Sequence, residues 1–453
     1  MGDSLEGTGF GRRSFLLGSS LAVVGAAGCL ETDPTAEEFD GGDGGGNGGG
    51  DDGDPDATVS GTEAPEPDFT VGDSDDADYE TVQQAYDALE SGDVIGLEPG
   101  THTLQPDVDN ARAGDGEDLT KTYTYVGDPD EETTLEFVTP EARSFVVRGP
   151  QRFKPEDGPP GFWHLTLDVP EDVTFARIDD DELDEYDGEY DGDADSYSEA
   201  QSDVNFCTVH GSLDGPVSAT ESVFYDALAH ELSPRDCHFM GTVRGSRITA
   251  RRCQFDGQLR SDNGWVTDSV IEGTANLNNV TLIRCDLDGG LNVTGHGRVE
   301  NCVIEPQPDS RQAISISSSY RVDITDSVIH GTVRSNQDGS YIDKFELNVF
   351  DVPSSTRWII DGAPATDIYL NAFVGGDVRI TTDSGDLSSF PADDLTLYDR
   401  ERELGNYYSE WDGEEAADGI LKARTLPGDD GEMDRYPLAH DDLESYVEDE
   451  DDD

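Results

Sequence analysis

The sequence predicts an all-β fold, a parallel β-solenoid that one helix closes at its N-terminal end. Small residues recur at steps of 15 to 17 residues, at Cys207, Ser222, Cys237, Cys253, Ser269, Cys285 and Cys302. Apolar residues follow them at fixed offsets, and no ten-residue helical pattern separates the repeats. A period of this length indicates one coil per repeat, because each coil must stack on the next to bury its apolar side chains.

Two apolar columns define the strands of each coil, counted from the small residue, which we term the anchor. The residue two after the anchor is Val209, Phe224, Phe239, Phe255, Ile271, Leu287, Ile304 or Ile329. The residue six after it is Leu213, Leu228, Val243, Leu259, Ala275, Leu291 or Val333. Alternation within each stretch indicates strands, and the glycines between them (Gly257, Gly273 and Gly289) indicate a sharp bend. We expect looser coils to continue with anchors at Ser327 and Ala372.

The anchors should stack as a ladder inside the solenoid. Five cysteines remain beyond Cys29, and an odd number at the repeat spacing does not predict a disulfide framework. We expect the ladder cysteines to be buried thiols that behave as small hydrophobic residues. Neither a CxxC pair nor a His/Cys cluster occurs, which argues against a zinc site.

The segment before the first coil predicts a helix over 78–90, because Val82, Ala85, Tyr86 and Leu89 recur at helical spacing. Gly92 should end it, and a strand over Val94–Leu97 should follow. The block "DYETVQQAYDALESGDVIGLEPG" resembles the opening of right-handed parallel β-helix proteins of the pectin-lyase-like fold. That resemblance implies a helix that caps the open end of the first coil, where apolar core and an unpaired strand edge would otherwise face water.

The C-terminal part carries a second resemblance. The stretches "GNYYSEWDG" (405–413), "DGI" (418–420) and "DRYPL" (434–438) are similar to the closing segment of β-helix proteins related to the nitrous oxide reductase maturation family, although the middle stretch is degenerate here. With the opening block, the resemblance covers roughly 70–440 and implies the fold. The copper-linked role of that family needs soft or imidazole ligands. With three Met and eight scattered His, this chain gives no reason to expect that role.

The N-terminus predicts export. The stretch "GRRSFLLGSSLAVVGAAGCL" places Arg12 and Arg13 before a short apolar run that ends at Cys29. It resembles a twin-arginine export signal joined to a lipobox, with Gly11 where that signal usually has Ser or Thr. The resemblance implies export of a folded protein, lipid attachment at Cys29 and a place on the extracellular face of the cell membrane. The alternative is an uncleaved N-terminal anchor, which also places the body outside the cell.

We therefore expect four parts: a signal segment (1–29), a Gly/Asp-rich disordered tether (30–67), the right-handed parallel β-helix (68–425), and a C-terminal segment with an acidic disordered tail (426–453). The 101 acidic and 28 basic residues give a net charge of −73, and only four residues are lysine. Such a surface repels itself in dilute buffer, whereas molar salt shortens the Debye length to about 3 Å. The charge indicates adaptation to very high salt and disfavours nucleic-acid binding.

Three rows of polar residues should face outward from the coils. The residue before the anchor is Asp236, Arg252, Asp268, Arg284 and then Asn301, and these alternating charges predict a structural ion-pair ladder, the corner row. The residue three after the anchor is Asp256, Glu272, Asp288 and Glu305, the acid row. Like charges on neighbouring strands destabilise a sheet, so salt, nearby arginines or a bridging Ca²⁺ should offset them. A carboxylate pair there could also serve glycoside hydrolysis, and a plain solvated acidic face is the remaining interpretation.

The third row lies seven after the anchor and forms the arginine strip: Arg244, Arg260, Asn276, Asn292 and Arg334, with Arg379 as a further candidate. Guanidinium forks match carboxylates in a two-pronged geometry, so the strip could grip an acidic or hydroxyl-rich glycan. The alternative is that these arginines compensate the acid row across the glycine bend.

The sequence favours an exported, lipid-anchored, salt-adapted β-helix protein that binds glycan or another cell-envelope component without catalysis. The alternative is a polysaccharide lyase or glycoside hydrolase with its site around Asp256, Glu272, Asp288 and Arg260, working on an acidic polysaccharide as pectin-lyase-like enzymes do on their outer faces. A structural spacer or adhesin is the third hypothesis. No segment matches a catalytic signature, which is why binding is favoured. Ca²⁺ is the one cofactor that the acid row suggests, through Asp256, Glu272, Asp288 and Glu305.

Overall fold

The computed structural model describes much of the chain from residue 63 onward. The described residues are 63–89, 92–104, 123–138, 145–147, 161–169, 173–175, 202–211, 213–214, 217–225, 228–306, 310–317, 321–335, 341–352, 358–362, 367–375, 377–380, 397–399, 402–409, 411–417, 419–425, 433–441 and 443–446. They belong to one compact unit, Glu63–Asp453. The predicted signal segment and most of the predicted tether lie outside the described residues.

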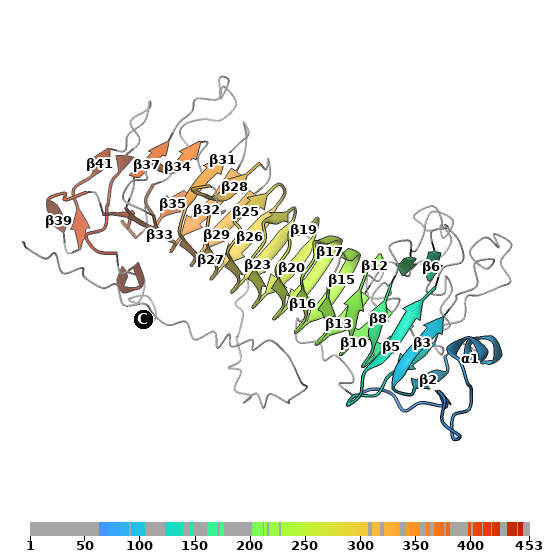
Figure 1. Cartoon of the computed structure of the whole chain (residues 1–453). Coiled ribbons are helices and arrows are strands. Elements are labelled where there is room, and N and C mark those ends of the chain that lie inside the picture. The colour runs from blue at the N-terminus through green and yellow to red at the C-terminus, as the bar shows by residue number, and fades with distance from the viewer. Residues whose placement is uncertain are drawn as a thin grey trace, which may run out of the picture. The chain divides into compact units, whose positions relative to one another are not determined.

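Two long parallel sheets contain most of the described strands (Figure 1). The larger has 22 strands in the described part of the chain: β1 (Phe69–Val71), β2 (Val94–Leu97), β4 (Thr124–Val126), β7 (Gly161–Trp163), β10 (Ser202–Asn205), β12 (Leu213–Asp214), β13 (Val217–Thr220), β15 (Leu228–Arg235), β17 (Val243–Arg251), β19 (Leu259–Ser261), β20 (Gly264–Thr267), β22 (Ala275–Leu277), β23 (Val280–Ile283), β25 (Leu291–Val293), β26 (Gly297–Glu300), β28 (Gln312–Ile316), β29 (Arg321–Thr325), β31 (Thr332–Ser335), β32 (Tyr341–Glu346), β34 (Trp358–Gly362), β35 (Asp367–Tyr369) and β37 (Asp377–Ile380).

The second parallel sheet has 14 strands within the described residues: β3 (Gly100–Leu104), β5 (Thr133–Phe137), β8 (Thr166–Asp168), β11 (Thr208–His210), β14 (Val223–Phe224), β16 (His238–Phe239), β18 (Gln254–Phe255), β21 (Val270–Ile271), β24 (Asp286–Leu287), β27 (Val303–Ile304), β30 (Val328–Ile329), β33 (Val349–Asp351), β36 (Ala372–Val374) and β38 (Tyr407–Tyr408). Short pairs join β6 (Phe145–Val147) to β9 (Val173–Phe175), β39 (Glu415–Ala417) to β40 (Ile420–Leu421), and β41 (Arg424–Thr425) to β42 (Met433–Asp434). The helices within the described residues are α1 (Val82–Ala88) and the 3₁₀-helix η5 (Leu443–Tyr446).

Each coil passes through both sheets, which confirms the predicted parallel β-helix. In one coil, the chain runs along β20 in the larger sheet, through β21 in the smaller sheet, and back along β22 in the larger sheet. Neighbouring coils pair in parallel and without slippage here: Phe255 is the register partner of Ile271, and Ile271 is that of Leu287. The 16-residue step therefore places equivalent side chains beside one another.

Helix α1 closes the N-terminal end as predicted but begins later than the expected residue 78. Thr81 is the N-cap, with its side-chain oxygen accepting a 3.2 Å hydrogen bond from Gln84 N. Val82 and Ala85 are buried in the core together with Ile95 of β2. In the part of the chain that the structure describes, no helix is long and apolar enough to cross a membrane.

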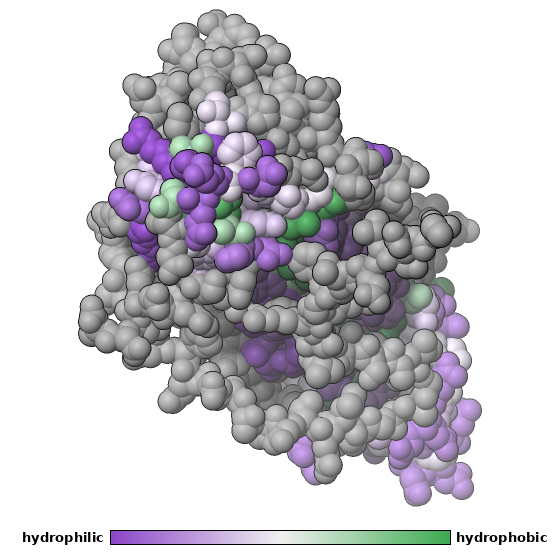
Figure 2. All heavy atoms as spheres, turned by 90° about the vertical axis from the view of Figure 1, so that its left-hand side faces the viewer, coloured by the Kyte–Doolittle hydropathy of each residue, from purple (hydrophilic) through white to green (hydrophobic). Residues whose placement is uncertain are grey.

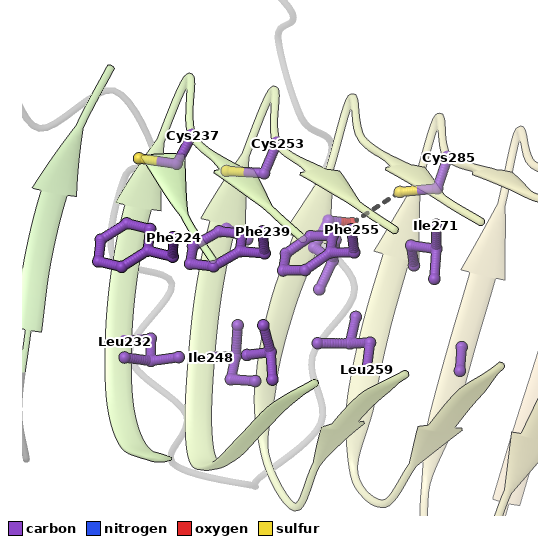
Figure 3. Packing of buried hydrophobic residues seen from close by; sticks show 14 of the residues in the cluster. Phe224, Leu232, Cys237, Phe239, Ile248, Cys253, Phe255, Leu259, Ile271 and Cys285 are labelled. Atoms are coloured by element: carbon purple, nitrogen blue, oxygen red, sulfur yellow. Dashed lines mark hydrogen bonds between the residues drawn. The ribbon is translucent and has the colours of Figure 1, made fainter. Parts of the chain in front are cut away.

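The interior is a set of stacked columns. The rings of Phe224, Phe239 and Phe255 lie parallel, with centroids 4.9 Å apart at each step (Figure 3). This is the spacing of neighbouring strands, so three successive members of the predicted apolar column form a ring stack. Phe350, Phe373 and Tyr408 form a similar stack near the C-terminal end, and all described members of the column are buried.

The glycine bend has a steric cause. A Cβ atom added to Gly257 would lie 2.2 Å from Gly241 O, and one added to Gly273 would lie 2.0 Å from Gly257 O. Successive coils thus approach so closely at this corner that a side chain would strike the backbone of the coil before.

The opposite corner explains the anchors. One residue with positive φ turns the chain there, as at Asp268 (52°), and the anchor follows it. The Ser269 hydroxyl accepts a 3.0 Å hydrogen bond from Cys253 N, the anchor amide of the coil before, and donates to Thr267 O at 2.7 Å. The anchor side chain is therefore a hydrogen-bonding group that satisfies a backbone amide of its neighbour.

The cysteine anchors are free thiols, as predicted. All five described cysteines are unpaired and buried, and burial raises the pKa of Cys207 to about 12. They also hydrogen-bond, which hydrophobic packing alone did not predict: Cys285 Sγ lies 3.2 Å from Val266 O, and Cys285 N donates to Cys302 Sγ at 3.5 Å. The thiols of the stack can be followed in Figure 3.

One predicted anchor was wrong: Asn371, not Ala372, occupies the anchor column. Ser327 N donates to Asn348 Oδ1 at 3.0 Å, Asn348 N to Asn371 Oδ1 at 3.1 Å, and Asn371 N to Asn406 Oδ1 at 3.1 Å. The amide groups of these fully buried asparagines also bond to one another and to backbone carbonyls. An asparagine amide can also donate to the side chain of the next anchor, as from Asn348 to Asn371, whereas the Ser269 hydroxyl donates to a carbonyl of its own corner.

Asp434 closes the ladder. Its carboxylate accepts hydrogen bonds from Asn406 N (2.8 Å), Tyr408 Oη (3.1 Å) and Tyr436 N (3.0 Å), and it is fully buried. The Arg424 guanidinium covers the Tyr408 ring at 4.2 Å from its centroid.

On the face in Figure 2, seen from the side of β39 in Figure 1, hydrophobic colour shows only in small areas between hydrophilic side chains.

The closing carboxylate gives a pH test. Burial raises the pKa of Asp434 to about 6, above its ordinary value in the unfolded chain. Its contribution to stability is therefore complete below about pH 4 and lost as the pH rises through 6, by about 3 kcal/mol in all. We expect the unfolding free energy of the wild type, relative to Asp434→Asn, to fall by this amount between pH 4 and 7 in urea titrations in molar KCl.

Asp412→Asn, which removes an exposed carboxyl elsewhere in the C-terminal part of the chain, is the control for loss of one charge. If the difference in unfolding free energy between the wild type and Asp434→Asn stays constant or rises with pH, the raised pKa of Asp434 is contradicted.

Candidate functional site

The corner row forms the predicted ion-pair ladder. Arg252 holds both carboxylate oxygens of Asp236 at 2.6 Å, and Arg284 holds those of Asp268 at 2.6 and 3.0 Å. These residues are the positive-φ residues of the corner, so each pair ties one turn to the next. The carboxylates and guanidinium groups of these two pairs bind each other, so we assign the corner row a structural role.

The acid row lies beside the smaller sheet, on consecutive coils. Asp256 N, Glu272 N, Asp288 N and Glu305 N each donate to a carbonyl of the coil before, which continues the ladder of the sheet. His238 contacts Asp256 at 2.9 Å, and Gln254 Nε2 bridges Asp256 (2.9 Å) and Glu272 (3.2 Å). Asp288 is exposed and has no side-chain partner among the described residues.

Like-charge repulsion acts between Asp288 of the row and Asp286, two residues earlier on β24. Burial, and then the charge of Asp288, raise the pKa of Asp286. Within the described residues, no three His, Cys, Asp or Glu side chains converge in a way that could hold a metal ion. Calcium binding by Asp256, Glu272, Asp288 and Glu305 therefore stays a prediction, and these four side chains do not converge on one point in the structure.

The arginine strip lies on the larger sheet in one continuous register. Arg244 pairs with Arg260, Arg260 with Asn276, and Asn276 with Asn292. The row then passes through Ser315 to Arg334, and through Asp361 to Arg379. Arg244, Arg260 and Arg334 are exposed, and Asn292 Nδ2 donates to Asn276 Oδ1 at 2.9 Å.

The strip arginines are not consumed by ion pairs. Arg244, Arg260 and Arg334 make no hydrogen bond or ion pair with any described residue. The strip is bordered by Thr242, Gln258 and Thr274 on one side and by Ser246, Asp262, Asn278 and Thr294 on the other. The sequence also allowed these arginines to compensate the acid row. In the described part of the chain, they make no direct contact with it.

The proposed catalytic residues fall into two places. Asp256, Glu272 and Asp288 are neighbours in the acid row beside the smaller sheet, whereas Arg260 lies on β19 of the larger sheet, beyond the glycine bend. No described hydrogen bond or ion pair connects Arg260 with any of the three carboxylates.

Sequence reasoning missed a groove beside the strip. It has a volume of about 530 Å³, and Arg247, Asn263, Trp265 and Asn279 lie along it. Arg247, Asn263 and Asn279 follow the strip residues Arg244, Arg260 and Asn276 by three residues each. The available signal was Trp265, an aromatic residue at an outward position between two threonines of the neighbouring coils, Thr249 and Thr281.

No protein-family model, curated protein or solved structure matches this chain. The fold is therefore assigned from its own sheet topology and register, and the site from its own side chains.

The acid row gives a salt-dependent prediction. Because Asp288 adds to a row of like charges, Asp288→Asn should raise the unfolding free energy by about 0.2 to 1 kcal/mol at the lowest KCl that keeps the protein folded. The gain should vanish in 3 M KCl, where the Debye length is below about 3 Å. Thermal unfolding at both salt concentrations measures it.

Asp262→Asn, an exposed acid outside the row, serves as the control. If Ca²⁺ instead bridges the row, millimolar Ca²⁺ will stabilise the wild type and Asp288→Asn will lose that stabilisation, which would contradict the solvated reading.

Proposed function

We propose that this protein is a non-catalytic surface protein whose arginine strip binds an acidic or hydroxyl-rich glycan of the cell envelope. The observation that carries the proposal is the register pair Arg244 and Arg260, two exposed guanidinium groups on neighbouring strands that have no partner among the described residues. Like charges directly opposite each other destabilise a sheet. A ligand with carboxylates spaced along the coil axis would relieve that repulsion.

The chemistry of the strip suits binding in high salt. Long-range attraction is screened over a few ångströms at molar ionic strength, so only direct contacts retain their strength. Guanidinium groups make two parallel hydrogen bonds to a carboxylate. The amide oxygen of Asn292, which accepts no hydrogen bond within the described residues, adds an acceptor for hydroxyls. The repeat of strands at about 4.8 Å makes the strip a linear array, which fits a linear polymer better than a compact ligand.

The location is proposed from the N-terminal sequence. The twin arginine and Cys29 support export and lipid attachment on the extracellular face of the cell membrane, with the Gly/Asp-rich residues as a tether. Recovery of Cys29→Ser from the medium instead of the membrane fraction tests this placement.

Polysaccharide lyase or hydrolase activity is the competing function. The separation of Arg260 from the acid row, with no described contact between them, favours binding over catalysis. A spacer without a ligand would leave the unpartnered arginines unexplained.

The strip is tested by titrating the full chain with polygalacturonate and alginate in molar KCl by calorimetry. We expect Arg244→Ala/Arg260→Ala to weaken binding at least tenfold, because a hydrogen bond to a charged group contributes about 1.5 to 3 kcal/mol. Arg260→Lys should lose part of the affinity, since lysine keeps the charge but not the fork.

Arg298→Ala is the matched control, because Arg298 is exposed and already paired with Glu300 at 2.5 Å. Equal binding by the double variant and the wild type, or no binding of either polymer, would refute the proposal. Release of an ultraviolet-absorbing unsaturated product would favour the lyase instead.

A further inference from the structure

We propose that the groove beside the arginine strip is a second binding site, which stacks a neutral pyranose ring on Trp265. The inference is independent of the proposed function, since it rests on other residues and on a ligand of different charge. The groove is formed by consecutive coils, with Arg247, Asn263 and Asn279 at equivalent corner positions and Trp265 beside them.

The indole lies on the outer side of its strand, away from the core. Val266, the next residue, faces the core and is fully buried, whereas the Trp265 side chain faces outward and is 39% exposed. On the two neighbouring strands the same position is Thr249 and Thr281, so a small polar residue suffices there. These short neighbours also leave the indole unshielded. An exposed indole in such a hydrophilic chain keeps a flat apolar surface available for a ligand.

The groove also holds polar atoms that the fold does not use. Arg247 makes no hydrogen bond or ion pair within the described chain, not even with its register partner Glu231. Asn279 Oδ1 accepts from His296 N at 2.9 Å, which leaves the amide hydrogens of Asn279 as donors. Asn263 Nδ2 donates to Ser246 O at 3.2 Å, which leaves Asn263 Oδ1 as an acceptor.

These atoms define the ligand. The charges of Glu231 and Arg247 cancel, so the groove is locally neutral in a chain with a net charge of −73. A phosphate or carboxylate would face Glu231 and the field of the acidic surface, which disfavours it. A pyranose ring has an apolar C–H face for the indole and a rim of hydroxyls, each a donor and an acceptor, for the free donors and acceptors around it.

The site is tested with neutral hexasaccharides, namely maltohexaose, cellohexaose and mannohexaose, added to the full chain in molar KCl. Affinity is measured by calorimetry and by the shift of tryptophan emission. We expect at least one of them to bind with a Kd on the order of 1 mM, and Trp265→Ala to weaken it at least tenfold. Trp265→Phe should retain part of the affinity, and Arg247→Ala should lose several-fold.

Met240→Ala removes another exposed apolar side chain, from the region beside the smaller sheet, and should bind like the wild type. Arg244→Ala/Arg260→Ala should keep neutral-sugar binding even where it loses acidic polymers, so the two sites fail separately. The proposal is overturned if none of the three sugars binds at about 10 mM, or if a folded Trp265→Ala binds as well as the wild type. Loss of neutral-sugar binding in the arginine double variant would overturn the independence of the groove.

Discussion

The structure depends on hydrogen bonds from anchor amides to the anchor side chains of the next coil. They form at Cys207, Cys253 and Cys285, and at every described anchor from Cys302 to Asn406. The positive-φ corner takes the chain from one sheet to the other, and the anchor amide that follows points along the coil axis. Ser269 shows the solution, with a hydroxyl that accepts from Cys253 N and donates to a carbonyl of its own corner. Where the ladder reaches its C-terminal end, Asp434 supplies the last acceptor. The fixed corner then holds the register of both sheets.

That register turns a repeat in sequence into rows in space. Inside, it stacks rings at 4.9 Å and excludes a Cβ at the glycine bend. Outside, it aligns equivalent side chains, for ion pairs in the corner row and for unpartnered guanidinium groups in the arginine strip. The same alignment makes the acid row repulsive, which molar salt relieves. The packing of the core and the rows on the surface therefore both follow from the constant spacing of the anchors.

The sequence predicted most of the fold because the coils between Cys207 and Cys302 repeat at nearly constant length. It failed at Asn371 because the anchor separations lengthen to 21, 23 and 35 residues beyond Ser327, so counting no longer fixes the position. The strip was predictable for the same reason that the coils were, since Arg244 and Arg260 sit at one offset from their anchors. The groove could not be predicted, because the turn beyond the strip follows no apolar pattern. Which atoms of Asn263 and Asn279 remain available to a ligand becomes clear only from the hydrogen bonds that these residues make.

The register of the strip across the coils can be measured directly as a distance between two spin labels. Labels on Arg244→Cys and Arg334→Cys, in a Cys29→Ser background whose other thiols are buried, would be five strand spacings apart, about 24 Å. The stacked register predicts one distance distribution centred near this value, broadened by the label linkers. A distribution centred beyond about 40 Å, or one without a defined maximum, would contradict the stacked register and every surface built on it.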